Sequence, residues 1–291
     1  MNDSLQPPTS GQAGCAILGH AFVESSLSGV AALRDGPPPA SATHLPARFL
    51  RHSDEHTVVA VHAVLAVMAS VKQAVAFDRC GVVAAPCQAG RIMTARSLSM
   101  LRTGGAVMVS PHIVPQCSLH SLAGAVSVAL GMHGPHLGVG GGPDALAEGL
   151  FSAMSLFQPG AASGCDAAWL IVTEWASEPE LDASGAALGD PVCRAVAMLL
   201  APAAVADAPL VLSLHLPPAM VATVTEDGMG GDLVAFTQAL DICGSGAALA
   251  SWTVTCPWGA QIRVSKPEPA ALAVSRRRPA GRVPMPSREA A

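Results

Sequence analysis

Three residues that lie close together in the sequence, His112, Cys117 and His120, have side chains that can take part in nucleophilic catalysis. A cysteine thiol becomes a nucleophile when a nearby histidine takes its proton. Sequence separation alone does not place the sulfur against an imidazole. Two interpretations stay open, a reactive group and, preferred here, residues that line a pocket or the core.

A second polar cluster, His52, Asp54, Glu55 and His56, stands at the entrance of a predicted helix. Histidines four residues apart share one helix face and can bind the same metal ion. Because no further ligand motif accompanies them, the pattern is more typical of a solvated first helical turn. The sequence therefore predicts no metal site.

The glycine-rich residues 138–142 are similar to a loop that binds the phosphates of a dinucleotide. In that motif the third glycine would fall at Pro143, and an acidic residue would follow in a strand about 20 residues later. Neither requirement is met. The sequence predicts no nucleotide or other cofactor.

Short apolar runs alternate with helical patterns along the chain, which predicts an α/β fold. Gly131 stands where a helix would end in a left-handed glycine cap. Strands are predicted at residues 15–22, 81–85, 137–140, 167–173, 192–200, 210–216, 250–256 and 260–264, and helices at 54–71, 119–130, 143–157 and 233–240.

Composition narrows the class of protein. A chain of 291 residues that is 51% hydrophobic and 13% charged is not wholly disordered. Its net charge of −5 argues against nucleic-acid binding. We predict a folded domain at 12–265, a disordered N-terminus at 1–11 and a disordered basic tail at 266–291. No apolar run reaches the roughly 20 residues that span a membrane, no signal peptide is predicted, and eight scattered cysteines indicate a reduced, cytoplasmic protein.

The densest motif signal runs from Ser110 to Glu174. It reads SPHIVP at 110–115, SLAGAVSVALG at 121–131, GPHLGVGGGPDAL at 134–146 and DAAWLIVTE at 166–174. This order resembles the N-terminal half of the β-ketoacyl synthases: an ALG helix end, a GPN turn and strand, a nucleophilic cysteine at a helix start, and a strand ending in GGTE. The resemblance implies an α/β, thiolase-like layered fold with a truncated C-terminal half.

By this resemblance the nucleophile's position, counted from Gly134, falls on Pro143. Proline has no thiol and no backbone N–H, and in the family the nucleophile's own amide is an oxyanion-hole donor. Loss of one such donor alone typically slows catalysis by about 100–1000-fold. Proline does suit the first position of a helix. The resemblance therefore implies a site whose structure is kept and which has no catalytic residue.

A thiolase-like chain without its nucleophile resembles the short chain-length factors, non-catalytic partners of ketoacyl synthases in aryl-polyene-like pathways of bacteria. The resemblance implies a heterodimer with a catalytic β-ketoacyl synthase, reached by an acyl carrier protein through the complex, in polyketide or fatty-acid-type biosynthesis. This chain would shape the acyl tunnel. The expected interface is an edge strand at Leu137, Gly138, Val139 and Gly140, which continues the partner's sheet.

Two other classes of function stay open. The chain could be a thioester-acting enzyme of altered chemistry that uses His112, Cys117 and His120, or a purely structural scaffold. A subunit that lives inside a dimer would also explain the large apolar content, because obligate interfaces resemble a domain core cut in half.

Overall fold

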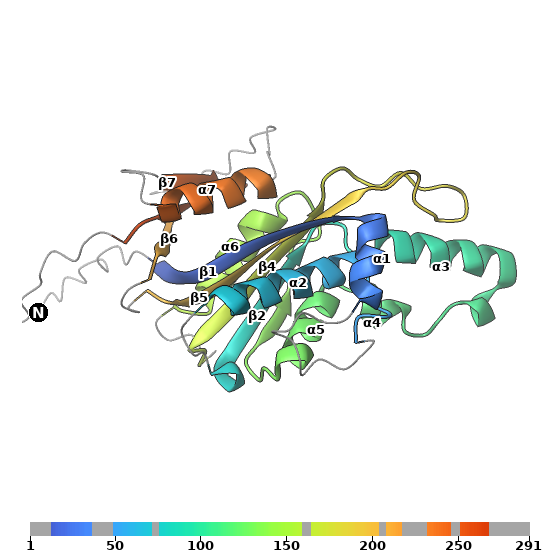
Figure 1. Ribbon diagram of the computed structural model, residues 1–291, viewed down its shortest axis with the longest axis horizontal. Helices are drawn as coiled ribbons and strands as arrows, with labels where there is room; N and C mark the ends of the chain where they lie inside the picture. Colours follow the sequence, from blue (N-terminus) through green and yellow to red (C-terminus); the bar gives the residue numbers. More distant parts are fainter. Residues whose placement is uncertain are drawn as a thin grey trace, which may run out of the picture.

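The computed structural model describes residues 13–36, 49–71, 76–158, 164–203, 208–216, 232–245 and 251–267. Within these residues, eight strands form one sheet in the order β3-β2-β4-β5-β1-β6-β8-β7 (Figure 1). Strand pairing is parallel among β3, β2 and β4 and antiparallel across the rest of the sheet. The strands are β1 (Ala13–Ser26), β2 (Cys80–Pro86), β3 (His136–Gly138), β4 (Ala167–Trp175), β5 (Val192–Pro202), β6 (Leu210–His215), β7 (Ser251–Thr255) and β8 (Gln261–Ser265).

Helices cover both faces of this sheet. One core lies between the sheet and α2 and α5, and a second lies between the sheet and α6 and α7. The helices of the described residues are α1 (Leu27–Asp35), α2 (Glu55–Ser70), α3 (Arg91–Gly104), α4 (Ile113–Cys117), α5 (His120–Leu130), α6 (Ala145–Ser155) and α7 (Leu233–Ser245).

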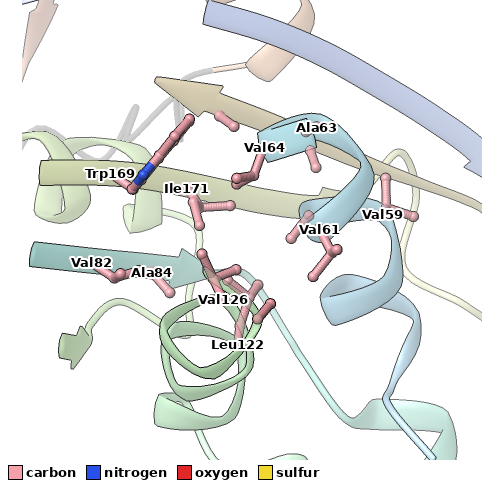
Figure 2. Packing of buried hydrophobic residues seen from close by; sticks show 14 of the residues in the cluster. Val59, Val61, Ala63, Val64, Val82, Ala84, Leu122, Val126, Trp169 and Ile171 are labelled. Carbon is pink, nitrogen blue, oxygen red and sulfur yellow. The ribbon is translucent and has the colours of Figure 1, made fainter. Parts of the chain in front are cut away.

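The central strands are apolar along their whole length because successive side chains point into different cores. In β4, Ile171 belongs to the core under α2 and α5, whereas Leu170 belongs to the core under α6 and α7. Figure 2 shows side chains of the first core: Val82, Ala84, Trp169 and Ile171 from the sheet, with Val61, Val64, Leu122 and Val126 from α2 and α5.

All eight predicted strands have counterparts in the sheet, and the four predicted helices correspond to α2, α5, α6 and α7. Helix α2 begins after Asp54, whose carboxylate accepts the Thr57 N–H at 2.9 Å. Helix α5 ends at Gly131, which has the predicted left-handed conformation with φ 63°. Local sequence patterns are therefore sufficient to predict these strands and helices.

The structure adds helices that were not predicted and shortens one predicted strand. A third expectation concerns residues that the structure does not describe. Helices α1, α3 and α4 were not predicted, and α3 buries only Ile92 and Ser97, so it has no apolar repeat to reveal it. The strand predicted at 137–140 ends at Gly138, and Gly140 turns away with φ 79°. The predicted disordered ends, 1–11 and most of 266–291, lie outside the described residues. Within the described ranges, no helix is long and apolar enough to cross a membrane.

Candidate site at the carboxyl ends of the parallel strands

A cavity of about 220 Å³ lies where β2 and β4 end and the chain leaves β3. In open α/β sheets, the carboxyl ends of parallel strands are the usual place for a ligand. Six of the nine residues in the wall are apolar, and the other three supply a thiol, a hydroxyl and a carboxylate. The wall consists of Cys87, Pro143, Ala145, Leu146, Val172, Thr173, Glu174, Trp175 and Leu233.

Backbone hydrogen bonds assemble this wall. The N–H of Cys87, the residue after β2, donates to the Thr173 carbonyl of β4 at 2.7 Å. On its other side Cys87 forms a parallel bridge with Gly141. The N–H of Gln88 donates to the same Gly141 at 3.3 Å, and Gln88 has φ 60°, a left-handed conformation uncommon outside glycine. The segment after β3 is thereby held beside β2 as it reaches Pro143.

Pro143 lies in the turn before α6, and its position corrects one expectation. The helix begins at Ala145 after its N-cap residue Asp144, so Pro143 precedes the first helical position. It still stands beside a helix N-terminus at the cavity wall, where a cysteine would be stabilised as thiolate. Proline offers this site neither a nucleophile nor an amide donor.

The sequence alone does not reveal Cys87 as a site residue. Cys87 is the one cysteine among the described residues that line the cavity. It lies there because the ends of β2, β4 and β3 meet at the same edge of the sheet. Burial raises the pKa of the Cys87 thiol, and the Glu174 and Glu178 carboxylates raise it further. The thiol is therefore protonated at neutral pH and is not an activated nucleophile.

We expect Cys87 to react with iodoacetamide at pH 8 more slowly than N-acetylcysteine, and its rate to keep rising above pH 9. Because the Glu174 charge raises the Cys87 pKa, Glu174→Gln should speed the reaction at pH 8 about two- to threefold. Peptide mass spectrometry over time measures both rates. Faster labelling of the wild type than of N-acetylcysteine at pH 8 would contradict this description.

A buried polar contact lies behind the cavity wall. His56 Nδ1 and Thr173 Oγ1 are 2.7 Å apart, and the His56 ring meets Trp175 edge-to-face with 5.4 Å between centroids. Burial lowers the pKa of His56, so the imidazole is neutral. His56 Nε2 and Trp175 Nε1 have no hydrogen-bond partner among the described residues. The contact ties α2 to β4 immediately beside the cavity.

The expectation of a solvated helix turn at residues 52–56 was wrong. His52 is exposed, but Asp54, Glu55 and His56 are buried. Asp54 caps α2, Arg34 contacts Glu55 at 3.4 Å, and His56 meets Thr173, so tertiary partners replace water. Among the described residues no group of three or more candidate ligands is arranged to hold a metal ion.

His112, Cys117 and His120 lie on the segment that contains α4 and the start of α5, and none of them belongs to the cavity wall. His112 and His120 are exposed, and Cys117 is half-buried. Burial raises the pKa of Cys117, although a hydrogen bond with Thr94 lowers it in part. The His120 ring contacts His136, with 4.9 Å between centroids. The described contacts do not assemble these residues into a Cys–His pair.

Comparison with known proteins identifies solved structures that share this fold. No protein-family profile matches the sequence, and no curated protein is similar to it. Two solved structures match 87% of this chain and 99% of theirs. One is AntDE:AntF, a type II PKS acyl-carrier protein in complex with its ketosynthase bound to the hexaketide (TM-score 0.57, 11% identity). The other is the ketosynthase ApeO in complex with its chain length factor ApeC from Xenorhabdus doucetiae (TM-score 0.52, 17% identity).

At these identities the likeness establishes the fold. Nearly all of each matched chain corresponds to this one, so the similarity is not confined to one supersecondary motif. The chain therefore has the layered α/β, thiolase-like fold found in ketosynthase and chain-length-factor complexes.

Proposed function

We propose that this chain is a non-catalytic, chain-length-factor-like subunit that pairs with a catalytic β-ketoacyl synthase in bacterial polyketide or fatty-acid-type, aryl-polyene-like biosynthesis. The observation that carries the proposal is Pro143, which lies at the cavity wall beside the N-terminus of α6. The fold supports the proposal because both matched structures are ketosynthase complexes. One holds a ketosynthase with its chain length factor, and the other holds a ketosynthase with its acyl-carrier protein.

The proposed role is to shape the acyl tunnel of the complex. Pro143, Leu146, Val172 and Leu233 supply the apolar part of the cavity wall, which an acyl chain would contact. An acyl carrier protein would reach this subunit through the complex.

A cytoplasmic location belongs to the same proposal, and thiols buried as deeply as Cys15 are in keeping with it.

The proposed interface is the free edge of β3, at Leu137, Gly138, Val139 and Gly140. Within the described sheet, β3 pairs only with β2, so its other edge can accept a further strand. The Leu137 side chain is 38% exposed at this edge. A ketosynthase strand added here would continue the sheet across the two subunits and cover Leu137.

Co-expression with a candidate β-ketoacyl synthase from the same genome tests the pairing. The tagged chain should retain the synthase, and Leu137→Asp should weaken the complex at least tenfold because it places an unpaired charge in an apolar interface. Ile242→Asp is the matched control, since Ile242 is 54% exposed on α7, which packs against β7 at the opposite edge of the sheet. A chain that retains no synthase would refute the pairing, and a complex unaffected by Leu137→Asp would refute the interface at β3.

The two alternatives have distinct readouts. Hydrolysis or transfer of an acyl thioester that Cys117→Ala abolishes would support an enzyme based on His112, Cys117 and His120. The exposed histidines and the raised Cys117 pKa give that alternative less support. If the chain is a purely structural scaffold, replacing it in the complex by a homologue would leave the length of the acyl product unchanged.

A further inference from the structure

The segment from Arg79 to Pro143 contains no aspartate or glutamate, although the chain has 21 of them. It comprises β2, α3, α4, α5 and β3. Two of its arginines have partners outside it: Arg79 Nε lies 3.1 Å from Asp166 Oδ2, and Arg91 pairs with Glu178. Arg96 and Arg102 on α3 are exposed and form no ion pair within the described residues. Every fixed charge of the segment itself is therefore positive, although residues 178–185, which include Glu180 and Asp182, lie beside α3.

The same segment exposes most of the large apolar side chains on the described surface. Nine of the thirteen large hydrophobic residues that are exposed fall within it, and Val107 is 90% exposed. Apolar side chains gathered on one part of a surface mark an interaction site more strongly than scattered ones. The nine are Leu98, Met100, Leu101, Val107, Met108, Val114, Leu119, Val128 and Leu137.

Much of this surface belongs to a projection that we call the α3–α4 arm, residues 91–117. It consists of α3, the 3₁₀ turn η3 (Ala106–Met108) and α4. Figure 1 shows α3 running away from the sheet and the chain returning through α4 toward α5. Because α3 buries only Ile92 and Ser97, the fold of this chain does not use the arm's apolar side chains.

The arm is continuous with the edge of β3. Helix α4 ends at Cys117, which packs against Gly90 at the start of α3. Two residues later, the Leu119 backbone lies directly on Gly138 of β3. A partner that adds a strand to β3 would therefore meet Leu119 first and then the arm.

We propose that the α3–α4 arm lies on the same partner subunit as the β3 edge, against a surface of that partner that combines apolar side chains with carboxylates. The inference rests on the proposed function and adds the chemistry that selects the partner. A second copy of this chain fits poorly. A two-fold dimer through this surface would bring the unpaired Arg96 and Arg102 of both copies into one interface to which the segment itself contributes no carboxylate. The lack of carboxylates thus favours a different, acidic partner and disfavours self-pairing.

The test compares Kd values of the complex with the co-purified ketosynthase at two salt concentrations. Arg96→Glu/Arg102→Glu should weaken binding at least tenfold at about 0.1 M salt, and the loss should shrink at about 0.5 M salt because screening shortens the range of charge interactions. Arg263→Glu/Lys266→Glu, two exposed basic residues near the opposite edge of the sheet, is the matched control and should bind like the wild type.

A third variant separates the apolar contribution. Val107→Ser should weaken the complex by a factor that does not depend on salt. An unchanged Kd for Arg96→Glu/Arg102→Glu at both salt concentrations would overturn the inference while leaving the pairing intact, whereas a wild type that binds no ketosynthase would refute the pairing itself. Sedimentation of the chain alone should show a monomer. A stable homodimer that Val107→Ser dissociates would also overturn the inference, because a second copy would then occupy the arm.

Discussion

Replacing Gly138 by alanine should push α5 away from the edge strand and lower the free energy of unfolding by about 3 kcal/mol. A Cβ added at Gly138 would lie 2.2 Å from the Leu119 carbonyl oxygen and 2.5 Å from the His120 nitrogen. Both are backbone atoms at the start of α5, so no side-chain rotation relieves the clash. Urea denaturation of the isolated chain measures the change.

Gly142→Ala provides the control for this substitution. It adds the same methyl group in the loop after β3, where no atom lies within 4 Å of the new Cβ. We expect its unfolding midpoint to match that of the wild type. Equal stability of Gly138→Ala and Gly142→Ala would show that α5 does not pack on β3 as described.

Asp54→Ala should lower the free energy of unfolding by about 3 kcal/mol, because one buried carboxylate holds two backbone groups. Oδ1 accepts the Thr57 N–H at 2.9 Å, which caps α2, and Oδ2 accepts the Gly90 N–H at 3.0 Å, just before α3. Alanine would leave the buried Gly90 amide without this partner. The side chain therefore joins α2 to the base of the arm.

Two further variants make this prediction specific. Asp54→Asn keeps an oxygen for one of the two bonds and should cost about half as much. Asp35→Ala removes an exposed aspartate at the last position of α1 and should change stability by less than about 0.5 kcal/mol. If Asp54→Ala were as stable as Asp35→Ala by urea denaturation, the buried carboxylate would not have the role described.

Much of the fold was predictable because its elements have strong local signals. Helix α2 follows a capping aspartate and is mostly apolar, without proline or glycine, and Gly131 ends α5. The arm was not predictable in this way. Three arginines interrupt α3, and its exposed apolar side chains follow no buried face of this chain. Its pattern reflects contacts outside the fold, so periodicity within one chain does not reveal it.

The site was predictable in part for a similar reason. Counting from a motif placed Pro143 at the first position of a helix, and it lies two residues before the start of α6. Cys87 carries no local signal, because its position depends on hydrogen bonds to two other segments, at Thr173 and Gly141. His56 looked solvated because polar residues at a helix start usually are, but its partner Thr173 is 117 residues away in the chain.

Hydrogen–deuterium exchange of the chain, alone and with the ketosynthase, tests pairing through β3 most directly. Free backbone amides at an edge exchange quickly, and a strand added from a partner protects them. We predict that the ketosynthase slows exchange in β3 and through residue 140, and leaves the opposite edge strand β7 unchanged. Unchanged exchange in β3 in a complex that has demonstrably formed, or protection confined to β7, would contradict the account.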